Sequence, residues 1–189
     1  MHKRAVGLWW VAGCVGLAAV TFAADAAPPS PYAGQERREI KALSADEMAA
    51  LGAGQGMGLA KAAELNRYPG PRHVLDLAEP LGLTAAQRAG TERLWTDMRA
   101  EAVRLGREIL SVESRLDERF RSGTVAEPEV SALTAELGRL QGELRASHLR
   151  AHVRLRAILT AEQVERYQHL RGYGTADAPE PAHQHGHMQ

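Results

Sequence analysis

The sequence predicts an all-α protein built on a long antiparallel helical hairpin with short flanking helices. Ala and Leu supply 55 of the 189 residues, whereas Val, Ile and Thr supply only 22. Sheet cores draw on β-branched and aromatic residues, so this composition favours helices. Apolar residues also recur three or four positions apart along two long segments. Three Ser/Thr-x-x-Glu/Gln motifs, typical of helix starts, precede helical patterns.

Two long helices are predicted between residues 84 and 158. The apolar positions of the first are Leu94, Met98, Ala102, Leu105, Ile109, Val112, Leu116 and Phe120. Those of the second are Val130, Leu133, Leu137, Leu140, Leu144, His148, Ala151, Leu155 and Ile158. Residues 122–126 interrupt the pattern, and Pro128 fits only the first turn of a helix. The short connection predicts antiparallel helices, and a third helix over about 160–171 folds back.

Residues 27–70 are predicted to form a Pro- and Gly-rich leader with short helices, ahead of a helical core over 71–173. Ser44 and Glu47 form a capping box that opens the first short helix. The glycines that follow, at positions 52, 54, 56 and 58, are expected to be a flexible joint. A phosphate-binding loop is excluded because no Gly-Lys-Ser/Thr ending follows. A helix over 59–66 and a turn at 68–71 complete the leader.

Residues 1–26 have the pattern of a signal peptide. A short basic start is followed by nineteen uncharged residues over 5–23 and by the small-x-small sequence Ala24-Asp25-Ala26. An uncleaved membrane anchor and a lipoprotein modified at Cys14 are the two alternatives. All three place the remainder outside the cytoplasm. Because no cysteine follows Cys14, disulfides and Cys-based catalysis are excluded for the rest of the chain.

The composition also excludes several functions. Lys plus Arg balance Asp plus Glu at 23 each, so no net field favours nucleic acid. No Gly-x-Ser-x-Gly, His-Glu-x-x-His or dinucleotide motif is present, and we expect a binding protein rather than an enzyme. A two-helix hairpin cannot bury both of its apolar stripes alone. The leftover apolar surface predicts a homodimer.

Two groups of histidines are candidate metal ligands. His183, His185 and His187 alternate in a flexible tail over 174–189, where they can bind Zn(II), Ni(II) or Cu(II). His148 and His152 share one helical face, because they are four residues apart. If the turn centres near Val125, the side chains level with them include Met98 and Glu101, which completes a shell for Ni(II), Co(II) or Zn(II). The alternative places His148 in the core, bonded to Glu101, with His152 in solvent.

The sequence resembles the Spy/CpxP superfamily of periplasmic helical proteins. The resemblance rests on a paired Leu-Thr-x-x-Gln motif: Leu83, Thr84 and Gln87, then Leu159, Thr160 and Gln163. That family includes ATP-independent chaperones that hold unfolded proteins on a dimeric concave surface, envelope-stress modulators and heavy-metal sensors. The resemblance implies a periplasmic stress protein that binds unfolded or misfolded proteins and responds to metal. The alternative is a Zn, Ni or Co sensor that signals to a membrane-bound regulator.

Overall fold

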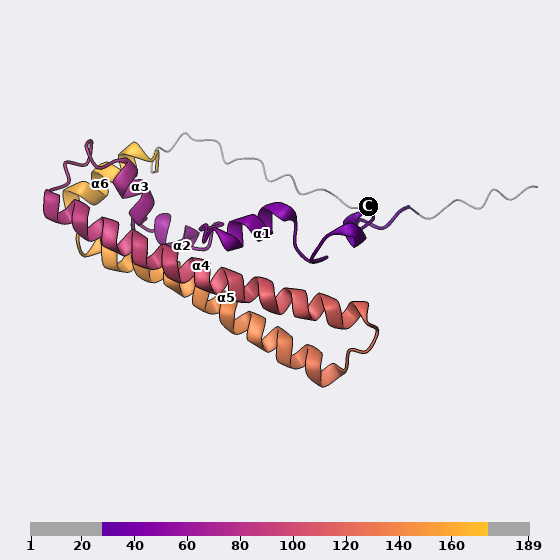
Figure 1. Cartoon of the computed structure of the whole chain (residues 1–189). Helices are drawn as coiled ribbons and strands as arrows, with labels where there is room; N and C mark the ends of the chain where they lie inside the picture. The colour runs from indigo at the N-terminus through magenta and orange to yellow at the C-terminus, as the bar shows by residue number, and fades with distance from the viewer. Residues whose placement is uncertain (1–27, 174–189) are drawn as a thin grey trace, which may run out of the picture. The chain divides into compact units, whose positions relative to one another are not determined.

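The computed structural model describes residues 28–173 (Figure 1). The predicted signal peptide and the three tail histidines, His183, His185 and His187, therefore lie outside the described residues. The chain divides into two compact units after Gly34. In the described part of the first unit, a turn forms in which the Ala33 amide donates to the Ser30 carbonyl at 2.9 Å. The second unit, from Gln35 onward, carries all the helices of the described region.

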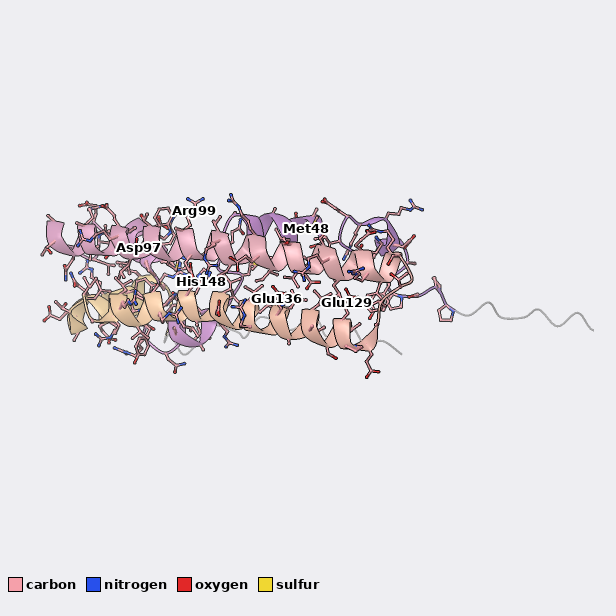
Figure 2. The ribbon with its side chains drawn as sticks, turned by 60° about the horizontal axis from the view of Figure 1, so that its bottom comes forward. Met48, Asp97, Arg99, Glu129, Glu136 and His148 are labelled. Atoms are coloured by element: carbon pink, nitrogen blue, oxygen red, sulfur yellow. The ribbon has the colours of Figure 1, made fainter. Side chains whose placement is uncertain are left out.

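The predicted helical hairpin is confirmed. Helix α4 (Ala85–Arg121) and helix α5 (Glu127–Arg156) run side by side, joined by residues 122–126 (Figure 1). Ion pairs of Arg119 with Glu129 at 2.6 Å and of Arg115 with Glu136 at 3.5 Å link the helices in the register that the turn position predicted. Both glutamates lie on the side of α5 that faces α4 (Figure 2). The described residues contain helices and no strand, so the all-α class is confirmed.

All three predicted helix caps are formed. Helix α1 (Ala45–Gly52), α4 and α6 (Ala161–Leu170) each begin with a reciprocal capping box. At α1, for example, the Glu47 carboxylate accepts the Ser44 amide at 2.8 Å while the Ser44 hydroxyl accepts the Glu47 amide at 3.2 Å. Each box satisfies two backbone donors that a helix start otherwise leaves open.

The apolar residues form two clusters. The first lies along the hairpin and contains Leu51, Ala102, Leu105, Ile109, Val112, Leu133, Leu137, Leu140 and Leu144. The second lies where α4 begins, α5 ends and α6 folds back, and contains Val74, Leu81, Leu155, Leu159, Val164 and Tyr167. One predicted stripe position is wrong: Phe120, one residue before the end of α4, is 58% exposed.

The leader differs from its prediction in two places. The expected helix over 59–66 is the single turn α2 (Lys61–Glu64), bounded by left-handed backbone at Gly58 (φ +76°) and Arg67 (φ +69°). The expected turn at 68–71 instead leads into α3 (Pro71–Asp76), which starts at Pro71. Proline suits this first helical position because its missing N–H has no partner to lose there. A 3₁₀ turn, η1 (Gln35–Arg37), precedes α1.

The leader packs against the hairpin rather than standing apart from it. Helix α1 lies along α4, and Leu51 is buried in the hairpin cluster (Figure 1). Gly106 makes this approach possible, because a Cβ there would stand 2.0 Å from the Leu51 carbonyl oxygen. At Gly54, where φ is +63°, a Cβ would stand 2.9 Å from the Val103 amide nitrogen. The glycine segment that was expected to be a joint is therefore also a packing surface.

The chain itself covers part of the apolar surface that predicted a homodimer. Leu51, with Leu43 and Leu59 beside it, occupies the hairpin face around Leu105 and Ile109. Leftover apolar surface was the reason for expecting a second copy, and the leader supplies a cover within one chain. Among residues 28–173, no helix has the length and apolarity that crossing a membrane requires.

Candidate functional site

A pocket of about 580 Å³ lies where the leader meets the hairpin. Its walls come from the glycine segment, from α2 and α3, and from the facing sides of α4 and α5. The lining includes Gly54, Gly56, Met57, Gly58, Glu64, Gly70, His73, Trp95, Met98, Arg99, His148 and His152. Glycines on one wall leave room that side chains would fill, and the helices opposite supply chemically active groups. The pocket exists only because the leader is docked.

Three of the predicted metal ligands meet in this pocket. Met98 from α4 and His148 and His152 from α5 all line it. His148 lies between the two long helices (Figure 2) and is 4% exposed. His152, which the alternative interpretation placed in solvent, is 8% exposed, and its Nδ1 lies 2.7 Å from the Tyr68 carbonyl oxygen. The (i, i+4) spacing therefore did place both imidazoles on one buried face.

Glu101 does not join them. Its carboxylate accepts two hydrogen bonds from the Arg104 guanidinium, at 2.7 and 2.9 Å, on the outer side of α4. These bonds hold the pKa of Glu101 below its usual value. The bond from Glu101 to His148 that the alternative interpretation expected is replaced by this neighbouring pair. An i, i+3 arginine competes successfully because it needs no particular register between the helices.

His148 is kept neutral by its surroundings. Burial, with the nearby charge of His152 as a second cause, lowers the pKa of His148. Its Nε2 atom is buried and has no hydrogen-bond partner. Buried polar atoms are usually paired, because an unpaired one costs about 1–3 kcal/mol. An unpartnered imidazole nitrogen beside an open pocket is a group that a ligand could satisfy.

The leader supplies the acidic group that Glu101 does not. Glu64, on α2, is 9% exposed and accepts hydrogen bonds on Oε1 from the hydroxyls of Tyr167 and, at 3.1 Å, Tyr173. Arg171 lies 3.6 Å from the same oxygen. Burial, followed by the hydrogen bond and charge of Glu64, raises the pKa of Tyr167, so this phenol stays a donor. One carboxylate oxygen thereby ties the leader to the end of the chain's helical core.

Glu64 lines the pocket, and its second carboxylate oxygen lies near His152. Oε2 is buried without a hydrogen-bond partner and lies 3.8 Å from His152 Nδ1. A Cβ on Gly70 would stand 3.5 Å from Oε2 and 3.0 Å from His152 Cε1, so only glycine leaves these groups their space. His73 Nδ1 lies 3.6 Å from Oε1. Two residues that line the pocket, Glu64 and His148, therefore each carry a buried polar atom without a hydrogen-bond partner.

The rim of the pocket is cationic and aromatic. The guanidinium carbons of Arg72 and Arg99 lie 5.9 and 5.4 Å from the centre of the Trp95 ring. Arg72 also donates two hydrogen bonds to Asp76, at 3.0 and 3.1 Å. Arg99 points away from the hairpin seam (Figure 2). Cations over an indole face are attracted by its quadrupole, which holds both side chains at the pocket mouth.

The donors do not form a finished metal centre. Within residues 28–173, no three His, Cys, Asp or Glu side chains are grouped closely enough to hold a metal ion. His73 and His152 lie 3.6 and 3.8 Å from the Glu64 carboxylate, which are ion-pair distances that leave Oε2 without a hydrogen-bond partner. A metal would therefore have to draw Glu64 Oε2, His148 and the Met98 thioether inward. Imidazole, carboxylate and thioether are ligand types that suit Ni(II), Co(II), Cu(II) or Zn(II).

The paired Leu-Thr-x-x-Gln motifs form a separate structural unit. Gln87 donates to the Gln163 side-chain oxygen at 2.8 Å, and Gln163 donates back to Gln87 at 3.0 Å. Each glutamine oxygen also accepts the amide of its own cap, Thr84 or Thr160, at 3.0 Å. The two motifs thus cap two helices and join them to each other. Their role in the described structure is to hold α4 and α6 together.

Some of the pocket residues were predicted from the sequence, and Glu64 was missed. Glu64 lies 103 residues from Tyr167 and 109 from Tyr173, and no local pattern links positions so far apart. The one available signal was the run of glycines at 52–58, which marks a place where backbone approaches another element. Met98, His148 and His152 were found because helical spacing and hairpin register are set by local sequence.

Comparison with known proteins gives one match. A family model described as "LTXXQ motif family protein" matches residues 71–171, which contain the hairpin, α3 and α6. No curated protein and no solved structure matches the chain. The matched region includes both motifs of the glutamine pair and the hairpin histidines, and it excludes Glu64 and the glycine segment.

Proposed function

Because the chain belongs to the LTXXQ motif family, the family of Spy/CpxP-type periplasmic proteins, we propose that it is a periplasmic stress protein that binds unfolded proteins without ATP. The observation that supports this proposal is the apolar face of the hairpin around Leu105 and Ile109, which a short leader segment covers. The proposed activity is binding rather than catalysis.

The leader segment that covers the hairpin face is weakly held. Helix α1 has eight residues, and Leu51 is its one buried residue. Isolated helices shorter than about 12–15 residues are marginal in water, so α1 depends on its docking for its own order. Unfolded proteins present leucine-rich segments that need the same kind of surface. A face that accepts Leu51 from the leader can accept a comparable side chain from an unfolded protein.

An aggregation assay tests this proposal. The purified protein is expected to delay the aggregation of reduced α-lactalbumin at near-stoichiometric ratios without nucleotide. Replacing Leu105 with Asp places a charge in the buried apolar cluster and is expected to remove the effect, provided that circular dichroism at 222 nm shows the variant to keep its helices. Replacing exposed Arg107 with Asp, on the same helix, is the matched control and should leave the protection in place. Absence of any delay by the parent protein would contradict the proposal.

Metal sensing is the second candidate, and the pocket supports it. Glu64 and His148, whose Oε2 and Nε2 atoms have no hydrogen-bond partner, line one pocket together with Met98 and His152. A bound Zn(II), Ni(II), Co(II) or Cu(II) ion would give both unpartnered atoms a partner. It would also join the leader to both long helices, which would give a membrane-bound regulator a changed surface to recognise.

Calorimetry distinguishes metal binding in this pocket from metal binding by the tail histidines. In a protein with His183, His185 and His187 replaced by Ala, we expect one Zn(II) or Ni(II) ion to bind per chain. Further replacement of His148 and His152 by Ala should abolish that binding, whereas replacement of exposed His169 by Ala should not. Equal binding by all three proteins would exclude the pocket as the metal site.

Homodimerisation remains a prediction. Exposed apolar side chains suitable for a second copy are Phe120, Val153 and Leu170, which lie on three different helices. Sedimentation equilibrium measures this directly: a mass of two chains at micromolar concentration is the expected result, and a single-chain mass at all concentrations would exclude it.

A further inference from the structure

Residues 41–64 of the leader are held on the helical core at both ends by polar anchors, to α4 at Lys41 and to α6 and Tyr173 at Glu64. At its start, the Lys41 amide and ammonium donate to the two carboxylate oxygens of Asp117, each at 3.3 Å. At its end, Glu64 accepts from Tyr167 and Tyr173. Between the anchors lie α1 and the glycine segment, whose buried contact with the hairpin is centred on Leu51.

From this arrangement we infer that residues 41–64 are a releasable cover, and that the hairpin face beneath α1 is the surface on which an apolar segment of an unfolded protein docks. This inference rests on the proposed function and adds the location of the binding surface and its regulation. The cover and the unfolded segment compete for one face, so the protein binds when the cover is released.

The cover itself shows what chemistry the face accepts. Residues 48–54, Met-Ala-Ala-Leu-Gly-Ala-Gly, carry no charge and place one leucine between small residues. Leu51 enters the cluster while its own carbonyl oxygen rests against Gly106. The face therefore fits a segment whose backbone can approach Gly106 closely and whose apolar side chain enters the cluster at the position of Leu51. Short, uncharged, leucine-containing segments of unfolded proteins have these properties.

Each anchor has a feature that weakens it. Lys41 is joined to Asp117 by bonds of 3.3 Å, which are long for a charged pair, and its side chain is 41% exposed. Glu64 is buried, but it sits on a helix of four residues that has no side-chain cap. Loss of the polar contacts at either end leaves the cover attached through the apolar contacts of Leu43, Leu51 and Leu59. The fraction of uncovered protein then sets the apparent affinity for a competing segment.

A double replacement tests the competition. Lys41→Ala with Glu64→Gln removes one charge of each sign from the two anchors and leaves the hairpin face unchanged. Arg139→Ala with Glu143→Gln breaks an exposed ion pair on α5 and makes the same change of charge, which provides the matched control. Each purified protein is assayed for amide hydrogen exchange in residues 45–51 and for delay of reduced α-lactalbumin aggregation.

The anchor variant is expected to exchange faster over residues 45–51 and to need a several-fold lower concentration for half-maximal protection than the parent and control proteins. Faster exchange with unchanged protection would show that the covered face is not the binding surface and would overturn the inference. Unchanged exchange would overturn it as well, because the anchors would not hold the cover. If none of the proteins protects α-lactalbumin, the proposed function itself fails, which is a different result from equal protection by all of them.

Discussion

Replacing Gly106 with Ala tests the contact that brings the leader onto the hairpin. The added Cβ would stand 2.0 Å from the Leu51 carbonyl oxygen, whereas ordinary contact begins at about 3.4 Å. The α1 backbone must therefore retreat by about 1.4 Å, and backbone cannot rotate away as a side chain can. Because Leu51 is the one buried residue of α1, this retreat removes most of the apolar contact that orders that helix.

The expected magnitude follows from two opposing effects. Exposing a buried leucine costs about 1.5–3 kcal/mol. Alanine in a helix interior is favoured over glycine by about 1 kcal/mol, which offsets part of that cost. Gly106→Ala should therefore lower the free energy of unfolding by about 0.5–2 kcal/mol. Gly142→Ala, at an exposed position of α5 with open space around it, should raise it by up to about 1 kcal/mol.

Urea denaturation followed by circular dichroism at 222 nm measures both variants, and hydrogen exchange of the α1 amides locates the change. The sign of the difference is the decisive quantity, because the two substitutions are chemically identical. If Gly106→Ala stabilises the protein as much as Gly142→Ala does, then α1 does not cross α4 at Gly106. That result would refute the claim that α1 covers this face of the hairpin.

Two further predictions concern the core. Gln87→Ala and Gln163→Ala should each lower the free energy of unfolding by about 1–2 kcal/mol, because each removes a helix cap and the hydrogen bonds between the two side-chain amides. The double variant should lose less than the sum of the two. Strictly additive losses in urea titrations would show that the two glutamines do not interact. Burial and the charge of His152 lower the pKa of His148, so below about pH 6.5 the unfolded chain binds a proton that the folded chain resists, and stability should fall as the pH drops through that range. His148→Gln should flatten this dependence in pH-jump or urea measurements, whereas His169→Gln should not.

The hairpin and its caps could be predicted because their causes are local. A helix places residues three and four apart on one face, and a capping box spans four residues, so α1, α4 and α6 follow from short stretches of sequence. The register of α4 against α5 follows from the length of the connection. This local information also brought Met98, His148 and His152 together, since each lies on the inner side of a helix.

The failed expectations share a different cause. Glu101 was expected beside His148, but Arg104, one helical turn away, bonds it instead. Glu64 takes the acidic position from a leader whose path depends on contacts with distant residues. A short helix with one buried leucine has too little local preference to specify where it docks, and the close approach at Gly106 decides it.

Sequence alone determined the helical class, the hairpin, its register and the paired glutamine motifs, because helical periodicity and capping act over only a few residues. The tertiary structure decided which face of the hairpin is covered, which carboxylate faces the histidines and how the two motifs bond to each other. These features depend on close packing between segments far apart in the chain. At Gly106, for example, the absence of a Cβ allows the α1 backbone to approach α4.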